Sequence, residues 1–282
     1  MKKFIALALA AIMAFSLAAC GSSGSNQSSS KTLTVAISPD FAPMEFVDTS
    51  KTGQDQYVGF DVTLAKYIAD EFGMELEIKP MSFDACQAAV QSGKVDMSIS
   101  GYSYTESRAE NFELSDWYYA GDNETKQVTI VLAENAGKWT TPEDYEGLTV
   151  AVQAASLQLQ MAENQLPGAE LKQFTDIGTE VEALRNGNVD AVAVAEGNGK
   201  AIIASNDNIA MSGFEFVVDE SEENNVILIQ KGNTELLEKV NAALAKAYES
   251  GFYGPWYEEA QALAGIDTAA DVSYDDEGNV AE

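Results

Sequence analysis

The sequence predicts an α/β fold made of two similar units. Short strands rich in Val, Ile and Ala alternate with amphipathic helices, and this alternation is typical of mainly parallel sheets with helices on both faces. The segment at 148–152 (LTVAV) repeats that at 33–37 (LTVAI), and residues 183–190 repeat the pattern of residues 89–96. Because both repeats keep the same order along the chain, we predict two domains of one architecture.

The elements of the first unit follow from hydrophobic periodicity. Residues 33–37 form the first strand, and residues 61–72 place apolar side chains on one helical face. Residues 74–78 and 95–99 read as strands, and residues 84–91 form a helix between them. The unit therefore contains the strand–helix–strand alternation of a parallel sheet.

The elements after the second unit are too few to form a third one. Residues 225–230 are predicted as a strand, residues 234–249 as a helix with apolar residues at helical spacing, and residues 253–264 as a last helix. These elements must pack on one of the first two units. Residues 265–282 are acidic and contain few apolar side chains, so we expect a loose tail.

The composition excludes several classes of function. The 282 residues include 45 Asp and Glu, 16 Lys and Arg and no His, for a formal charge of -29. Without His there is no Ser-His-Asp triad, no Cys-His dyad and no His-ligated zinc site, and metal capture is disfavoured. A strongly acidic chain is repelled by phosphate backbones, so we expect no nucleic-acid partner.

The N-terminus has the layout of an export signal. Lys2 and Lys3 precede an apolar stretch, and Leu-Ala-Ala then leads to Cys20. This order resembles the lipobox of bacterial lipoproteins, which implies a signal peptide at residues 1–19 and a lipid on Cys20 that holds the protein at the membrane. An ordinary secretory signal with an incidental Cys is the alternative.

The segment at 20–31 is rich in Gly and Ser and is predicted to be a flexible tether. The other cysteine is Cys86, so no disulfide framework is expected once Cys20 carries a lipid. Cys86 falls on the apolar stripe of the helix at 84–91 and is predicted to be a small core residue.

Two loops that each follow a strand and open a helix are candidate binding elements. Ser103 and Glu106 have the spacing of a capping box, and the helix start that they predict would attract an anion. Arg108, one turn later, can offer a planar fork to a carboxylate. Ser156 is predicted to cap the helix that follows the strand at 148–152. The alternatives are a solvated surface charge for Arg108 and a purely structural cap for Ser156.

Five stretches of the sequence resemble the bacterial solute-binding proteins of family 3, the extracytoplasmic receptors of polar amino-acid ABC importers, similar to the glutamine-binding protein. They occur in the order found in that family, within residues 31 to about 260. The stretches are FAPMEF at 41–46, VGFDVTLA at 58–65, SGKVD at 92–96, YTESR at 104–108 and LSDWYY at 114–119.

The resemblance implies a periplasmic-binding-protein-like fold of type II with a ligand cleft between two lobes. It implies that residues 32–120 and 222–264 form lobe 1 and that residues 121–221 form lobe 2. The chain would then cross between the lobes near residues 118–126 and 218–224. Two crossing strands form a hinge, and contacts of the ligand with both lobes favour a closed state.

The resemblance also implies roles for individual residues. Arg108 falls where the family's Arg binds the α-carboxylate of the ligand, and Gly101 and Ser103 fall on the loop that contributes backbone and hydroxyl contacts. Ser156 matches the small hydroxyl residue whose helix start approaches the carboxylate from the other lobe. Phe41 and Phe83 occupy the positions of aromatic residues that sandwich the ligand, and core packing is the alternative for both.

The sequence departs from the family at the residue that pairs with the ligand's α-ammonium group. The family has an acid there, whereas this chain has Ala195, with Glu196 one place later. Neighbouring residues of a strand point to opposite faces, so Glu196 is not an automatic substitute. Three alternatives remain: the strand ends early and Glu196 turns inward, another acid such as Asp40 serves, or the ligand lacks an α-ammonium group.

The resemblance therefore implies a monomeric binding protein, with no cofactor, that captures a polar amino acid outside the cell membrane and delivers it to an ABC permease. One alternative is an enzyme, since cyclohexadienyl dehydratases share this fold. Such chemistry requires a positioned acid or base, for which Glu196 is the candidate. The other alternative is a lipoprotein that only senses its ligand.

Overall fold

The computed structural model describes residues 31–118, 126–219 and 224–266 of the chain. Several predictions therefore lie outside the described residues: the signal peptide, the lipid on Cys20, most of the tether, the middle of both chain crossings and most of the acidic tail. No helix within the described ranges is both long and apolar enough to cross a membrane.

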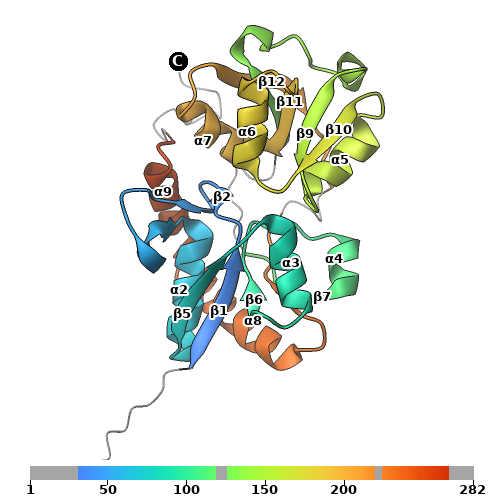
Figure 1. The fold of residues 1–282 in the computed structure, drawn as a ribbon. Coiled ribbons are helices and arrows are strands. Elements are labelled where there is room, and N and C mark those ends of the chain that lie inside the picture. The colour runs from blue at the N-terminus through green and yellow to red at the C-terminus, as the bar shows by residue number, and fades with distance from the viewer. Residues whose placement is uncertain (1–30, 119–125, 220–223, 267–282) are drawn as a thin grey trace, which may run out of the picture. The chain divides into compact units, whose positions relative to one another are not determined.

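The first sheet is mixed and has the strand order β5–β1–β6–β13–β7 (Figure 1). β1 is parallel to β5 and β6, whereas β13 is antiparallel to β6 and β7. The strands are β1 Thr32–Ile37, β5 Glu75–Pro80, β6 Met97–Ser98, β13 Leu228–Gln230 and β7 Phe112–Leu114. The helices of this part of the chain are α2 Phe60–Phe72, α3 Phe83–Gln91, α4 Glu106–Asn111, α8 Thr234–Glu249 and α9 Tyr253–Leu263.

The second sheet has the order β10–β9–β11–β8–β12. β9 is parallel to β10 and β11, and β8 is antiparallel to β11 and β12. The strands are β8 Gln127–Leu132, β9 Thr149–Gln153, β10 Glu170–Phe174, β11 Ala191–Ala195 and β12 Ile209–Glu215. The helices here are α5 Leu157–Gln165, α6 Ile177–Arg185 and α7 Glu196–Ala204.

A small antiparallel sheet, β2–β3–β4, follows β1. Its strands are β2 Asp40–Phe41, β3 Glu45–Val47 and β4 Tyr57–Val58. Short 3-10 helices lie at Gly53–Gln56, Ala133–Asn135 and Pro142–Tyr145. The small sheet positions Asp40 and Phe41 beside the end of β1.

The internal repeat predicted from the sequence has a structural counterpart in matching hydrogen bonds. In the first sheet the Thr34 backbone N–H donates to Asp96 Oδ2 at 2.8 Å. In the second sheet the Thr149 N–H donates to Asp190 Oδ2, also at 2.8 Å. Each Asp therefore ties the start of its strand, β6 or β11, to the neighbouring parallel strand, β1 or β9, which explains why the repeated motifs contain Thr and Asp at these positions.

The prediction of an α/β fold is confirmed, and four of the five strands of each large sheet run in one direction, as expected for mainly parallel sheets. In each sheet the fourth strand, β13 or β8, runs antiparallel to its neighbours. β8 follows β7 of the first sheet in the chain, and β13 follows β12 of the second. Each antiparallel strand is thus the first strand after the chain leaves the other sheet. Local sequence patterns do not reveal the direction in which such a strand enters its sheet.

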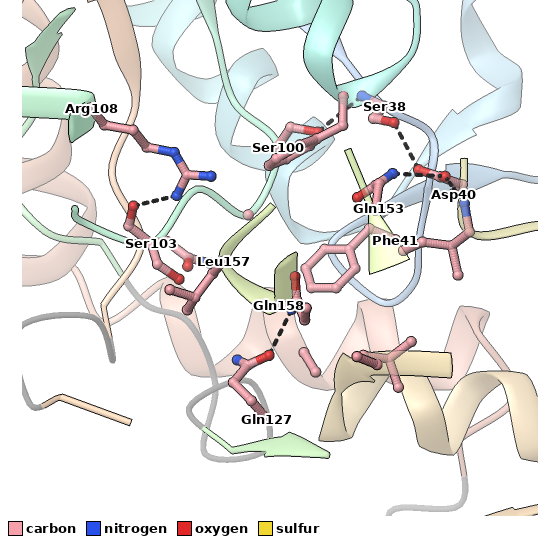
Figure 2. A pocket seen from close by; sticks show the side chains of 17 residues that line it. Ser38, Asp40, Phe41, Ser100, Ser103, Arg108, Gln127, Gln153, Leu157 and Gln158 are labelled. Atoms are coloured by element: carbon pink, nitrogen blue, oxygen red, sulfur yellow. Dashed lines mark hydrogen bonds between the residues drawn. The ribbon is translucent and has the colours of Figure 1, made fainter. Parts of the chain in front are cut away.

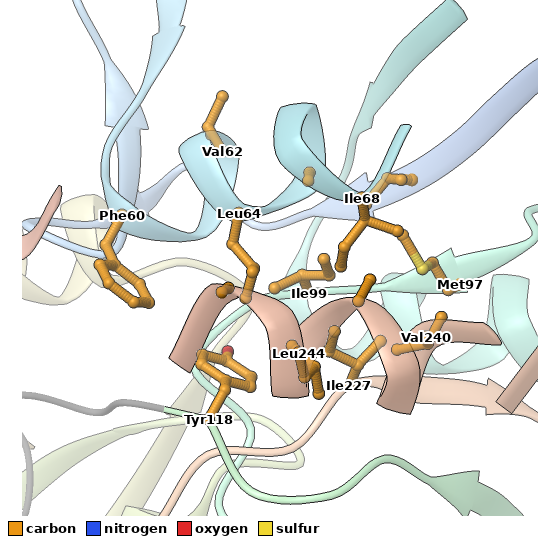
Figure 3. Close-up of a cluster of buried hydrophobic side chains, with 14 of the residues drawn as sticks. Phe60, Val62, Leu64, Ile68, Met97, Ile99, Tyr118, Ile227, Val240 and Leu244 are labelled. Atoms are coloured by element: carbon orange, nitrogen blue, oxygen red, sulfur yellow. The ribbon is translucent and has the colours of Figure 1, made fainter. Parts of the chain in front are cut away.

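The helices after the second sheet pack on the first one, as expected. α8 buries Val240 and Leu244 against α2 and the first sheet (Figure 3). Tyr257 of α9 belongs to the same buried cluster. Phe60, at the start of α2, has no exposed surface and contacts the rings of Tyr253 and Tyr257 edge-on. This shared core joins residues that are far apart in the sequence.

Helix boundaries follow the sequence more closely than strand boundaries do. The helix predicted at 234–249 has those bounds, and that predicted at 61–72 begins one residue earlier. The strands predicted at 95–99 and 225–230 are shorter in the structure, where they span Met97–Ser98 and Leu228–Gln230. Cys86 is fully buried, as predicted, and burial raises the pKa of its thiol to about 12.

Glu180 on α6 is a buried carboxyl whose replacement should stabilise the protein. It has no exposed surface, and neither carboxyl oxygen has a hydrogen-bond partner among the described residues. Burial, followed by the nearby Asp40 and Asp176, raises its pKa well above the usual value. The folded state therefore holds a proton that the unfolded state releases, and stability falls as the pH rises above the unfolded value of about 4.5.

We expect Glu180→Met to increase the free energy of unfolding by about 1–3 kcal/mol at pH 8 and by less at pH 5, because it removes an unsatisfied buried group. Urea unfolding at the two pH values measures this. Glu238→Met, at an exposed position of α8, is the control and should change stability by less than about 0.5 kcal/mol. An equal or lower stability of Glu180→Met at pH 8 contradicts the prediction.

Candidate functional site

A cavity lies between residues of the first and second sheets, at the ends of several strands. The non-atom space that its lining surrounds is about 590 Å³, including the part open to solvent. Its lining residues from the first sheet and its neighbouring loops are Ser38, Asp40, Phe41, Phe83, Ser100, Gly101, Ser103, Arg108 and Asn225. Those from the second are Gln127, Gln153, Leu157, Gln158, Ile177, Ala193, Val194 and Ala195.

Arg108 is buried against this cavity, with 6% of its surface exposed. Its Nη1 donates to the carbonyl oxygen of Ser103 at 2.7 Å, and its Nη2 donates to that of Ala155 at 3.2 Å. The guanidinium also lies 5.7 Å from the ring centroid of Phe83 and 5.3 Å from that of Tyr102. These contacts fix the fork of Arg108, so it is not a solvated surface charge.

The helix that carries Arg108 begins differently from the prediction. Its N-cap is Thr105, whose hydroxyl accepts the Arg108 N–H at 3.2 Å. Ser103 forms a β-bridge with Asn225 instead, so the predicted capping box of Ser103 and Glu106 is wrong. The reason is that Ser103 is held in extended backbone by long-range pairing, which leaves the next hydroxyl residue to cap the helix.

Gly101 permits a close approach between its loop and Phe41. Its φ is +56°, and a Cβ atom there would lie 2.6 Å from Cε1 of the Phe41 ring. Its N–H donates to Asp61 Oδ2 at 2.8 Å. Glycine is therefore required both by the backbone conformation and by the position of the aromatic ring.

Phe41 and Phe83 both line the cavity and both pack on other side chains. Phe83 is 8% exposed, and its ring centroid lies 4.8 Å from that of Tyr102. Phe41 is partly buried and packs against the cores of both sheets. Core packing is therefore shown for both side chains, and their contact with a ligand stays a prediction.

Asp40 is the acidic residue among those that line the cavity, and Arg108 is the basic one. Figure 2 shows them on opposite sides of it. Asp40 Oδ1 accepts the Ser38 hydroxyl at 2.8 Å, and Oδ2 accepts the Ile177 N–H at 2.7 Å and Gln153 Nε2 at 3.3 Å. Burial raises the pKa of Asp40, and the hydrogen bond from Ile177 opposes this rise.

Two predicted site residues do not line the cavity. Ser156 caps α5, as predicted, with its hydroxyl accepting the Leu159 N–H at 3.0 Å. Glu196 begins α7, and its carboxylate lies 3.6 Å from Lys200 Nζ. The strand ends at Ala195, which does line the cavity, and Glu196 follows in α7, so the structure does not bring Glu196 into the cavity as the first alternative required.

Three glutamines of the lining were not identified from the sequence. Gln153 is the last residue of β9, and Gln158 Nε2 donates to Gln127 Oε1 at 2.6 Å. The position of Gln153 directly after a predicted strand was a usable signal, because ligand sites of open α/β sheets lie at strand ends. Gln127 is on β8, whose placement in the second sheet depends on long-range pairing.

The arrangement suits recognition of a small charged molecule by fixed polar groups. The described residues bring no three His, Cys, Asp or Glu side chains together in a group that could hold a metal ion. The lining provides a guanidinium, a carboxylate, amides, hydroxyls and two aromatic faces, which is the composition expected for a specific binding pocket.

Comparison with known proteins relates this site to a family. The family model for bacterial extracellular solute-binding proteins, family 3, matches residues 33–260. The arginine-binding extracellular protein ArtP of Bacillus subtilis is 32% identical over 254 residues, covering 89% of this chain and 94% of that protein. The glutamine-binding protein GlnH of an ABC transporter of the same organism is 28% identical over 277 residues, covering 92% and 97%.

A solved structure has the same fold. The amino acid ABC transporter substrate-binding protein AbpA of Streptococcus pneumoniae, bound to L-arginine, gives a TM-score of 0.75 at 34% identity. The match covers 84% of this chain and 97% of that one. The chain therefore belongs to the bacterial extracellular solute-binding proteins of family 3.

Proposed function

We propose that this protein is the extracytoplasmic receptor of an ABC importer and that it binds a cationic amino acid, arginine first among them. The observation that carries the proposal of an amino-acid receptor is the pair of opposite charges, Arg108 and Asp40, in one cavity, which matches the carboxylate and ammonium groups of an amino acid. The names of the relatives, which include arginine-binding proteins, support the cationic class.

Arg108 binds the α-carboxylate in this proposal. Its guanidinium is buried and oriented by two backbone carbonyls, so little conformational entropy is lost when a carboxylate binds. A planar guanidinium can form two parallel hydrogen bonds with a carboxylate. Gly101 and Ser103 line the cavity on the same loop and contribute polar contacts, and the start of α5 at Ser156 approaches from the second sheet.

Asp40 binds a cationic group of the ligand in this proposal, as the alternative to the acid that Ala195 replaces. Its carboxylate lines the cavity, whereas Glu196 is paired with Lys200 and does not. A cation beside Asp40 would also favour the ionised form that burial disfavours. The aromatic faces of Phe41 and Phe83 are suited to the aliphatic stem or the planar guanidinium of the ligand.

The protein closes around its ligand by a movement of two lobes in this proposal. Lobe 1 comprises residues 32–120 and 222–264, and lobe 2 comprises residues 121–221. Hydrogen bonds from Arg108 to Ala155, from Ile177 to Asp40 and from Asn198 to Ala42 cross between the two parts. Contacts of this kind stabilise a closed form, and a ligand held by both lobes adds to them.

The N-terminal segment attaches the protein to the membrane in this proposal. A lipid on Cys20, with the signal peptide at 1–19 removed, anchors the protein to the outer face of the cell membrane, and the tether at 20–31 keeps the receptor near the permease. We infer that the receptor acts as a monomer by binding and release, without a chemical step and without a cofactor.

A thermal-shift screen of residues 31–266 against amino acids tests the ligand class, since a ligand of the native state raises the melting temperature. The panel contains arginine, lysine, ornithine, histidine, glutamine, cystine and glutamate. We expect the largest shifts with arginine and the other cationic amino acids. If no amino acid raises the melting temperature, the receptor function is refuted, and an assay with prephenate and arogenate then tests the enzyme alternative.

Asp40→Asn tests the role of the cavity carboxylate. We expect about tenfold weaker binding of arginine by calorimetry, because a hydrogen bond to a charged partner is replaced by a neutral one. Binding of glutamine should weaken to a similar extent, because every amino acid carries the α-ammonium group that Asp40 would pair with. Asp70→Asn, an equal change of charge at an exposed position of α2, is the matched control. Unchanged arginine affinity in Asp40→Asn rules out this role and leaves the receptor function standing.

A further inference from the structure

Two carboxyl groups lie under the ligand cavity without taking part in its lining. Glu45 is the first residue of β3, and Asp61 is the second residue of α2. Neither has any exposed surface. Buried acidic side chains without a basic partner are rare because desolvation disfavours the charged form, so the pair requires an explanation.

The pair is connected to the edge of the cavity by hydrogen bonds. Asp61 Oδ2 accepts the Gly101 N–H at 2.8 Å and the Tyr118 hydroxyl at 3.0 Å. The Ser100 hydroxyl donates to Glu45 Oε1 and accepts the Ser38 N–H at 2.9 Å. Ser38, Ser100 and Gly101 all line the cavity, so the two carboxyls fix three of its residues.

The second oxygen of each carboxyl indicates how the two groups are related. Glu45 Oε2 and Asp61 Oδ1 are buried and have no hydrogen-bond partner among the described residues. An orphaned buried acceptor is costly. One proton on the pair allows the hydrogen bond between the two side chains, whereas two ionised carboxylates cannot form it and repel each other.

The surroundings favour a single proton on the pair. Burial raises the pKa of Asp61 to about 6, and burial followed by the charge of Asp61 raises that of Glu45 well above its usual value. Hydrogen bonds from Gly101, Glu45 and Tyr118 favour the ionised form of Asp61. The other titratable groups that face the pair are Asp40, Tyr102 and Tyr118. Near neutral pH, Glu45 therefore holds the proton and Asp61 the charge.

We propose that Glu45 and Asp61 form a singly protonated acid pair that positions the Ser38, Ser100 and Gly101 edge of the ligand cavity, and that ligand affinity depends on the ionised form of Asp61. The dependence of ligand affinity on Asp61 rests on the proposed receptor function. Asp61 and Glu45 are positioning residues, since they act through the backbone of Gly101 and the hydroxyl of Ser100 without contacting the ligand.

The proposal has a direct consequence for pH. As the pH falls through about 6, Asp61 takes up a proton, and the Gly101 N–H loses a charged acceptor. The loop is then held less firmly, so affinity for the ligand decreases. Glu45 remains protonated throughout this range and does not contribute to the change.

The test combines a measurement on the unliganded protein with one on the complex. We would follow the Gly101 amide signal by NMR from pH 5 to pH 8 in the wild type, Glu45→Gln and Asp61→Asn, and measure L-arginine affinity by calorimetry over the same range. We expect the Gly101 signal to titrate near pH 6 in the wild type and in Glu45→Gln, and not to titrate in Asp61→Asn.

Affinity should follow the same pattern. Glu45→Gln imitates the protonated carboxyl and should keep most of the wild-type affinity, whereas Asp61→Asn should lower it about tenfold at pH 7.5, as expected for the loss of a charge-assisted hydrogen bond. The affinity of the wild type should fall more steeply below pH 6 than that of Asp61→Asn, in which the cavity carboxyl of Asp40 is left to titrate. Asp70→Asn controls for the change in charge.

The results distinguish the acid pair, its positioning role and the receptor function. A Gly101 signal that does not titrate in the wild type overturns the acid pair, whether or not arginine binds and whether or not Asp61→Asn folds. A titrating signal combined with equal affinities of Asp61→Asn and the wild type overturns the positioning role. A wild type that binds no amino acid refutes the proposed function and the dependence of affinity on Asp61, while the NMR titration still decides whether the acid pair exists.

Discussion

Replacing Arg108 with alanine is expected to weaken the binding of L-arginine about a hundredfold, on the order of the loss of a buried charge-assisted pair. The guanidinium lies at the cavity wall with only 6% of its surface exposed. Two backbone carbonyls and two aromatic rings hold it in one orientation. Alanine would remove both the positive charge and this prearranged geometry.

Calorimetric titration of Arg108→Ala and Arg108→Lys measures the effect. Lysine keeps the charge but lacks the planar fork, so it should recover only part of the affinity. Arg185→Ala is the control, because Arg185 is exposed on α6 and pairs with Glu182 at 2.7 Å. An affinity of Arg108→Ala equal to that of the wild type would refute the role given to Arg108, since the variant removes the base that lines the cavity.

Replacing Gly59 with alanine is expected to lower the free energy of unfolding by about 3–5 kcal/mol, as the sum of a strained backbone conformation and an overpacked site. The φ of Gly59 is +119°, and a Cβ atom would lie 2.3 Å from the carbonyl oxygen of Met44 and 2.8 Å from that of Pro43. Those two carbonyls accept the N–H groups of Asp61 and Phe60 at 2.8 and 3.1 Å, so the clash disturbs the start of α2.

Gly73, at the other end of the same helix, provides the matched control. Its φ is +61°, but a Cβ atom there would meet no atom within 4 Å. Gly73→Ala should therefore cost only about 1–2 kcal/mol, the cost of a left-handed conformation. Urea unfolding of both variants compares them, and similar losses at the two positions would show that contact with Met44 and Pro43 is not the cause.

Features that depend on neighbouring residues could be predicted from the sequence. The helix at 234–249 follows from apolar spacing, and the Ser156 cap follows from a hydroxyl placed before a helix. The repeat of Thr34 and Asp96 in Thr149 and Asp190 indicated two equivalent sheets. The helix and the cap depend on residues that are close together in the sequence. The bonds of the two Asp residues could be predicted because the same motif occurs twice.

The candidate site could be predicted only in part. The buried Arg108 beside Gly101 and Ser103 was identified through a family resemblance, and the cavity brings these residues together with Phe41 and Phe83. The cap of α4 was assigned to Ser103 instead of Thr105 because the bridge from Ser103 to Asn225 joins residues 122 positions apart. Nothing in the local sequence marks such a partner.

The sequence by itself determined the class of the fold, its repeated units, most helix bounds and the family of this protein, because periodicity, caps and motifs act over a few residues. Only the tertiary structure decided that β8 and β13 are antiparallel, that Asp40 meets Ile177, and that Glu45 and Asp61 lie together under Gly101. Those features depend on which distant segments pack together, and burial then decides how the carboxyl groups ionise.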